Sequence, residues 1–130
     1  MRTAYNLGLW AEARCRASLA LQGYRIVASR YKTPVGEIDI IAMRDDVLAF
    51  VEVKARPDLG QAAEAVSLRQ KKRIVRAAQH FALKHGAKFA RCNWRFDAML
   101  VAPWRWPRHI ESAWREDEVA LCGSGMSWRR

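Results

Sequence analysis

Charged residues interrupt a segment that is otherwise apolar and β-branched. Residues 36–54 read GEIDIIAMRDDVLAFVEVK, and the two apolar runs of this segment carry Glu37, Asp39, Glu52 and Lys54. Charged side chains are rarely fully buried unless they are paired or bound to a ligand. Their position in runs typical of a buried β-hairpin therefore predicts a site with a chemistry of its own.

Side-chain alternation along a strand predicts which of these residues share a face. Glu52 and Lys54 are two positions apart, so they point to the same side of their strand. A hairpin that turns at residues 44–46 (Arg-Asp-Asp) brings Asp39 near Glu52. Two carboxylates and one amine are thus expected to meet at the edge of an apolar layer.

Two clustered carboxylates repel each other in a low-dielectric environment, and a hard divalent cation such as Mg²⁺ or Mn²⁺ relieves the repulsion. Such a metal can activate a water molecule and neutralise charge on a phosphate. Lys54 would stabilise the developing negative charge or position the nucleophile. The chemistry that fits this set is phosphodiester hydrolysis. The alternative is a structural salt bridge between Lys54 and either Asp39 or Glu52.

The elements around this hairpin determine how its residues are positioned. Apolar residues at helical spacing, followed by Gly23, predict a first helix over residues 5–22. Ser67 and Gln70 fit a capping box that opens a second helix, which Gly86 closes. Alternation and turn residues predict strands at 24–31, 37–43, 47–54, 94–101 and 108–114.

This order, αβββαββ, describes a single α/β domain. The chain of 130 residues is long enough for one core. The domain is predicted to span residues 1–115, and residues 116–130, which end in GSGMSWRR, are predicted to be a flexible C-terminal tail.

Several motifs of this sequence resemble the YraN family of small bacterial proteins. GEID (36–39) and FVEVK (50–54) resemble that family's GEIDLI and VFVEVK signature. The similarity extends over residues 5–114 and includes Ala11-Glu12, Gly23-Tyr24-Arg25-Ile26, Ala63-Glu64-Ala65-Val66, Arg95-Phe96-Asp97 and His109-Ile110-Glu111-Ser112-Ala113-Trp114. The YraN family is in turn similar to the PD-(D/E)xK nucleases, which include archaeal Holliday junction resolvases.

The resemblance implies a restriction-endonuclease-like fold, with a mixed sheet flanked by helices. It implies that Asp39 and Glu52 are metal ligands, that Lys54 is the catalytic lysine and that Glu12 completes the acidic site. The residues alone place Glu12 at the edge of the apolar face of its helix, where an ion pair with Arg16 at i+4 is the alternative role.

The net charge of +10, from 23 Lys and Arg against 13 Asp and Glu, favours a polyanionic partner. The predicted second helix concentrates this charge in a stripe formed by Arg69, Lys72, Arg73, Arg76 and His80. The stripe is predicted to contact nucleic-acid phosphates, and a solvated helix face is the alternative. Lys71 falls on the apolar side, where it either snorkels to solvent or points toward Lys54.

Composition and residue pattern also predict the cellular compartment and the oligomeric state. Cys15, Cys92 and Cys122 are far apart and form no CxxC pair, which predicts reduced thiols without a zinc site. The sequence lacks a signal-peptide pattern and an apolar run of about 20 residues, so a cytoplasmic protein without a membrane segment is expected. Trp104 and Trp106, flanked by arginine, could stack on unpaired bases, but a subunit contact, and hence a homodimer, is favoured.

The function predicted from these observations is a Mg²⁺-dependent nuclease, for which DNA is favoured over RNA as the substrate class and branched or damaged DNA are candidate substrates. One alternative is a nucleic-acid-binding module that has the same fold and no hydrolytic activity. Another is an interaction subunit whose basic face binds an acidic protein. Only the enzyme should require the cation.

Overall fold

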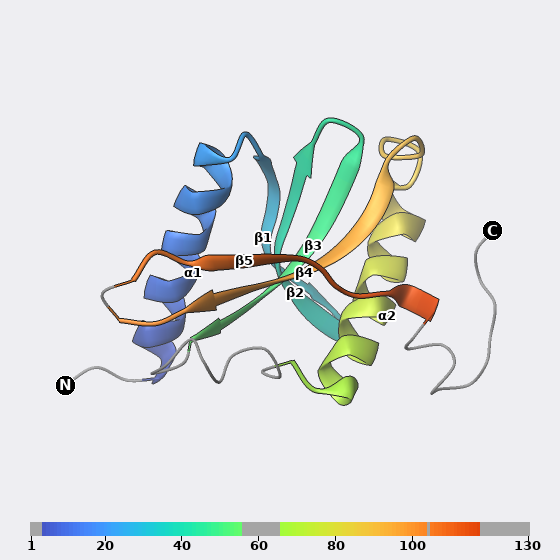
Figure 1. The fold of residues 1–130 in the computed structure, drawn as a ribbon. Coiled ribbons are helices and arrows are strands. Elements are labelled where there is room, and N and C mark those ends of the chain that lie inside the picture. Colours follow the sequence, from blue (N-terminus) through green and yellow to red (C-terminus); the bar gives the residue numbers. More distant parts are fainter. Residues whose placement is uncertain (1–3, 56–65, 104, 118–130) are drawn as a thin grey trace.

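The computed structural model of this chain describes residues 4–55, 66–103 and 105–117, and of residues 4–8 it describes the backbone alone (Figure 1). The elements, in chain order, are α1 (Ala4–Leu21), β1 (Arg25–Thr33), β2 (Gly36–Arg44), β3 (Val47–Ala55), α2 (Leu68–His85), β4 (Asn93–Val101) and β5 (Arg108–Trp114). The predicted order αβββαββ is confirmed. The predicted flexibility of the tail falls mostly on residues 118–130, which lie outside the described residues.

The five strands form one mixed sheet in the order β1-β2-β3-β4-β5. Strands β3 and β4 run parallel, and the other neighbouring pairs are antiparallel. A parallel pair requires a crossover connection, which α2 supplies here. This arrangement is the one expected of a restriction-endonuclease-like fold.

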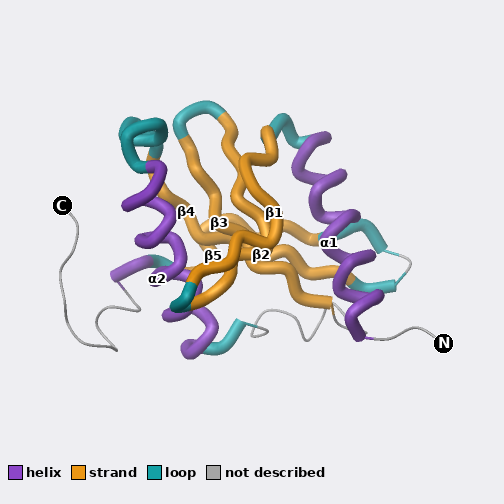
Figure 2. The backbone as a smooth tube through the Cα atoms, turned by 180° about the vertical axis from the view of Figure 1, so that it is seen from behind, coloured by secondary structure: helices purple, strands orange, loops and turns teal. Residues whose placement is uncertain are grey.

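The two helices cover opposite faces of the sheet (Figures 1 and 2). On β3, Phe50 packs in the cluster with α2, and its neighbour Val51 packs in the cluster with Cys15 and Leu19 of α1. Successive side chains of a strand point to opposite faces, so this division follows directly from the pleat. The sheet is buried on both sides, which explains why its central strands are apolar almost throughout.

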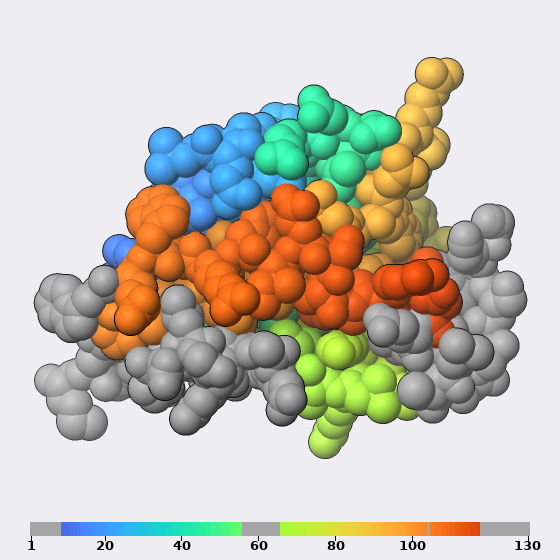
Figure 3. All heavy atoms as spheres, in the orientation of Figure 1, coloured from blue at the N-terminus to red at the C-terminus, as the bar shows by residue number. Residues whose placement is uncertain are grey.

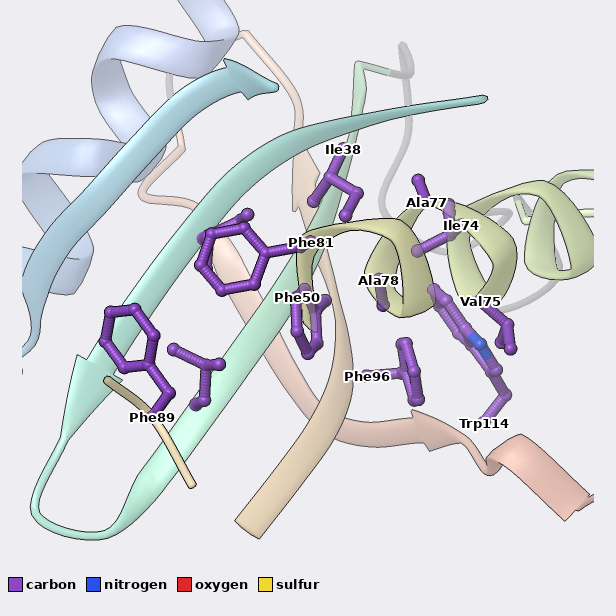
Figure 4. Close-up of a cluster of buried hydrophobic side chains, with 12 residues drawn as sticks. Ile38, Phe50, Ile74, Val75, Ala77, Ala78, Phe81, Phe89, Phe96 and Trp114 are labelled. Carbon is purple, nitrogen blue, oxygen red and sulfur yellow. The ribbon is translucent and has the colours of Figure 1, made fainter. Parts of the chain in front are cut away.

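Aromatic rings form a large part of the core beneath α2 (Figure 4). Phe50 stacks on Phe96 with ring centroids 5.5 Å apart, and Phe96 stacks on Trp114 of β5 at 5.7 Å. Phe81 of α2 meets Phe50 edge-on at 6.0 Å. Each such ring removes a large apolar area from water, so this stack fixes α2 and β5 against the central strands.

The ends of the helices follow the predicted signals. Ser67 Oγ accepts from the backbone N–H of Gln70 at 3.1 Å, and Gln70 Oε1 accepts from the backbone N–H of Ser67 at 3.1 Å. The predicted capping box is therefore confirmed. Gly23 follows α1 with a φ of +93°, a left-handed conformation that glycine adopts without strain.

Across the described residues, no helix is long and apolar enough to span a membrane.

Candidate active site

A local change in β2 positions Asp39. Ile38 packs in the cluster beneath α2, whereas Ile40 packs in the cluster beneath α1. Residues two apart in a regular strand share a face, so β2 rotates at Asp39. The facing residue on β1, Arg30, has a φ of +55°, which is an unusual backbone angle for any residue other than glycine.

The pairing between β2 and β3 changes at the same point. The backbone ladder includes the pair Ile40 and Val51, and in the same register Asp39 would face Glu52 next. The carboxylate of Asp39 instead accepts a hydrogen bond from the backbone N–H of Val53 at 2.8 Å. A side chain thus takes the place of a backbone carbonyl, which places its carboxyl group between the two strands.

Glu52 and Lys54 lie on β3 beside this carboxyl group. Lys54 Nζ is 3.3 Å from Glu52 Oε2, and their side chains are 15% and 12% exposed. On the parallel neighbour β4, their partners are the buried residues Ala98 and Leu100. The ion pair therefore has apolar neighbours and little screening by water, which strengthens electrostatic interactions within it.

The acidities of Asp39 and Glu52 reflect this environment. Burial, followed by the charge of Asp39, raises the pKa of Glu52 to about 8, although the charge of Lys54 lowers it. Burial also raises the pKa of Asp39, although the hydrogen bond from the backbone N–H of Val53 lowers it in part. The two carboxyl groups hydrogen-bond to each other. A proton held between them relieves their repulsion, so the pair binds a proton at a pH where isolated carboxylates do not.

Glu12 reaches the site from α1. Its side chain is buried, and burial followed by the charge of Asp39 raises its pKa. Arg16 Nη1 lies 3.5 Å from Glu12 Oε1, so the ion pair at i+4 is also present. The neighbouring thiol of Cys15 has its pKa raised to about 12 by burial and by the charges of Asp39 and Glu12, which keeps it protonated.

The donor atoms available for a metal are carboxylate oxygens. Among the residues that the structure describes, no three His, Cys, Asp or Glu residues form a group placed to hold a metal ion. Asp39 and Glu52 bring two carboxyl groups into hydrogen-bond contact. This set fits a hard cation such as Mg²⁺ or Mn²⁺, which accepts one or two carboxylates and keeps several waters.

The basic stripe lies on α2, the helix against which β2 begins. Arg69, Arg73 and Arg76 are exposed. A Cβ atom on Gly36 would lie 2.6 Å from the backbone oxygen of Arg73, so only glycine allows β2 to begin against α2. This contact brings the start of β2, three residues before Asp39, against the helix that carries the stripe.

The other basic residues of α2 are less exposed. Lys72 is half-buried, and so is His80, whose Nδ1 is buried without a hydrogen-bond partner among the described residues. Lys71 Nζ lies 6.0 Å from the centroid of the Trp114 ring. Of the two roles expected for Lys71, this contact favours snorkelling along an aromatic ring over an approach to Lys54.

A second charged cluster was not anticipated from the sequence. Asp97 is fully buried and accepts hydrogen bonds from Arg95 at 2.8 and 2.9 Å and from the backbone N–H of Ser112 at 3.1 Å. His109 Nε2 lies 2.7 Å from Asp97 Oδ2. The cluster joins β4 to β5 where their register shifts. The signal for it was present in the charged residues of the otherwise apolar segment WRFDAMLV (94–101).

A family model described as "Uncharacterised protein family UPF0102" matches residues 11–101. The chain belongs to the UPF0102 family. This membership confirms the resemblance to the YraN family, which is the same family. The UPF0102 match includes Glu12, Asp39, Glu52, Lys54 and the whole of α2.

Curated UPF0102 proteins are similar over most of the chain. A UPF0102 protein of Parvibaculum lavamentivorans is 52% identical over 112 residues, which are 86% of this chain and 84% of that protein. A UPF0102 protein of Nitrobacter winogradskyi is 52% identical over 110 residues, covering 85% of this chain and 92% of that protein. A UPF0102 protein of Bradyrhizobium sp. (strain BTAi1) is 53% identical over 110 residues, covering 85% of this chain and 80% of that protein. The similarity therefore extends along nearly the whole length of these UPF0102 proteins.

Proposed function

We propose that this chain is a Mg²⁺- or Mn²⁺-dependent nuclease that hydrolyses phosphodiester bonds in DNA. The observation that carries the proposal is the meeting of Asp39, Glu52 and Lys54 where the β2–β3 ladder gives way to a side-chain contact. Two hydrogen-bonded carboxyl groups with raised pKa values and an adjacent ammonium group are typical of a functional site. The family's similarity to PD-(D/E)xK nucleases supports the same assignment of roles.

Asp39 and Glu52 would hold the cation, which when bound would neutralise charge on the phosphate and activate a water molecule. The proton that these two carboxyl groups share must leave before they bind the cation, so cation binding should strengthen as pH rises. The ammonium of Lys54, 3.3 Å from Glu52, orients that carboxylate and would stabilise negative charge on the phosphate. Glu12 adds negative charge beside Asp39, while Arg16 holds its carboxylate in place.

The DNA backbone would lie along α2. Arg69, Arg73 and Arg76 project from one face of this helix, and the close contact between Gly36 and Arg73 joins that helix to the strand that carries Asp39. Lys72 would add charge to this face, and Lys71 would add charge beside Trp114. Phosphate contacts of this type give an affinity that falls steeply as the salt concentration rises. The preference for DNA over RNA, and for branched or damaged DNA, belongs to this proposal.

A second candidate function is supported by the contacts that the site residues already make. Lys54 neutralises Glu52, and Asp39 satisfies the backbone of Val53, so these groups also have a structural role without a metal. A nucleic-acid-binding module without hydrolytic activity would retain both contacts and the basic stripe. It would bind DNA equally well with and without a divalent cation.

One experiment separates these functions. The purified protein is incubated with end-labelled single-stranded, duplex and branched DNA and with RNA, in Mg²⁺, Mn²⁺ or EDTA. The proposed nuclease should cleave at least one DNA substrate in Mg²⁺ or Mn²⁺ and none in EDTA. Salt-sensitive binding without cleavage on the whole panel would instead support the binding module.

A further inference from the structure

Two tryptophans are exposed at the corner where α1 meets the connection between β4 and β5. Trp10 of α1 is 36% exposed, and Trp106 of the connection is 53% exposed. The described part of the connection lies at the surface beside α1 in both views of the chain and is orange in Figure 3. Trp104, the other tryptophan of the connection, lies outside the described residues. Large aromatic side chains left in water at one place indicate a surface that binds something.

Arg14 joins these two side chains into one cluster. Its guanidinium carbon lies 5.0 Å from the centroid of the Trp10 ring and 5.6 Å from that of Trp106. Arg14 Nη2 also donates to the backbone oxygen of Arg105 at 2.7 Å. Because the planar cation is held from several sides, the two indoles are fixed in advance of any ligand, which lowers the entropy lost on binding.

The cluster, defined as Trp10, Arg14 and Trp106, lies at the same end of the sheet as the candidate active site. Lys54 pairs with Leu100 on β4, and Leu100 pairs with Arg108 on β5. Two interstrand spacings amount to about 10 Å between Lys54 and Arg108, which is two residues from Trp106. On α1, Trp10 and Arg14 lie one turn apart and flank Glu12 along the chain, but they point away from the buried side of the helix that carries Glu12.

The chemistry of this corner identifies its ligand. The segment from 101 to 110 contains Arg105 and Arg108 and no Asp or Glu. A second copy of a chain with a net charge of +10 would bring the same cations against themselves, which disfavours a subunit contact here. Nucleic acid combines negative charge with flat aromatic groups, and unpaired bases stack on exposed indoles and on arginine.

We propose that Trp10 and Trp106, which Arg14 holds in place, stack on unpaired nucleobases of a DNA strand whose backbone passes the candidate active site. The substrate class is therefore DNA with a single-stranded segment, such as a flap or an open branch. Paired bases are stacked on each other and cannot offer their faces to the indoles, so a continuous duplex would not use this cluster. The inference rests on the nucleic-acid binding in the proposed function, but not on hydrolysis.

The test compares affinities for a labelled single-stranded oligonucleotide and for a fully paired duplex of the same length. Fluorescence anisotropy is measured in EDTA, so that cleavage cannot interfere. Trp106→Ala and Trp10→Ala should each weaken single-strand binding about tenfold and change duplex binding less than about threefold. Trp106→Phe should restore most of the affinity, because a phenyl ring also stacks. Leu83→Ala, which truncates an exposed apolar side chain on α2, is the matched control and should change neither affinity.

Arg14→Gln gives a second test that keeps both indole side chains but removes the cation that holds them, and it should also weaken single-strand binding. Unchanged single-strand affinity in these variants, or equal losses for single strand and duplex, would overturn the inference. So would a change from dimer to monomer in sedimentation without a change in affinity, because the cluster would then be a subunit contact. A preference for single strands without cleavage in Mg²⁺ would contradict hydrolysis and support this inference.

Discussion

At the scale of single residues, Asp39 and Glu52 form a pair that is costly to ionise. Their carboxyl groups are largely buried and hydrogen-bond to each other, and one proton between them relieves the repulsion. A divalent cation would relieve it more effectively than Lys54 alone, because it binds both carboxylates directly. The pair is therefore expected to respond to metal, to pH and to the loss of a single charge.

Asp39→Asn tests whether the pair is a metal site. The asparagine oxygen can still accept from the N–H of Val53, and the substitution removes one negative charge from a buried pair. In EDTA, the melting temperature of the variant should equal or exceed that of the wild type, and added Mg²⁺ should stabilise only the wild type. A loss of about 3 kcal/mol, the scale for breaking a buried ion pair, with no Mg²⁺ effect on the wild type would favour a structural salt bridge.

The pKa of Glu52 predicts how stability depends on pH. Its value of about 8 lies above the ordinary 4.5, so between these limits the folded chain binds more protons than the unfolded chain. Stability should therefore fall as pH rises from 5 to 8, by roughly 3 to 4 kcal/mol in EDTA. Urea unfolding across this range measures the effect. Glu52→Gln should flatten the slope, and an equally steep slope in this variant would assign it to another group.

At the scale of elements, β2 and β3 show what the sequence could predict. Alternation correctly placed Glu52 and Lys54 on one face of β3, because that strand is regular. The rotation of β2 at Asp39 was not predictable, since it occurs beside Arg30 of the neighbouring strand, whose positive φ no local sequence pattern indicates. The capping box of α2 is a local signal and was predicted correctly. The position of Lys71 depends on Trp114, 43 residues along the chain, so the sequence left it open.

The basic stripe of α2 should determine DNA affinity. Replacing Arg69, Arg73 and Arg76 with Gln should weaken binding and lower the slope of log K against log salt by about 0.7 to 0.9 for each lost phosphate contact. Stability should change by less than about 0.5 kcal/mol, because these side chains are exposed. The affinities of the variant and the wild type for DNA are compared across a salt titration.

A matched control for the stripe changes the same amount of charge elsewhere. Lys84, Lys88 and Arg91 are exposed near the far end of α2 and after it. Their replacement with Gln should have a smaller effect on affinity and on the salt slope. Equal effects from the two triple variants would show that net charge, and not the stripe, attracts the DNA.

The cluster around Asp97 should hold β5 in register. Burial alone would raise the pKa of Asp97, but the hydrogen bonds from His109 and Arg95 outweigh it and keep the pKa below its ordinary value. This contribution to stability is present above about pH 4 and is lost as pH falls further. Asp97→Asn should cost about 3 kcal/mol in urea unfolding at pH 7. A change below 1 kcal/mol would contradict this role.

At the scale of the whole molecule, one end of the sheet gathers the features that nucleic acid would contact. The carboxyl pair lies between β2 and β3, the basic helix packs near the start of β2, and the exposed tryptophans flank the ends of β4 and α1. The net charge of +10 would speed the encounter with DNA but cannot select a substrate. The arrangement of residues at this end of the sheet would therefore determine which DNA substrate is bound.

Cleavage by single-site variants tests the central claim most directly. End-labelled branched DNA with a single-stranded arm is incubated in Mg²⁺ with the wild type, Glu52→Gln, Lys54→Ala and, as a control, Asp117→Asn, which changes an exposed carboxylate. The wild type and the control should cleave, and the two site variants should bind the DNA but lose at least about 100-fold in rate. Cleavage that persists unchanged in Glu52→Gln and Lys54→Ala would contradict the proposed active site.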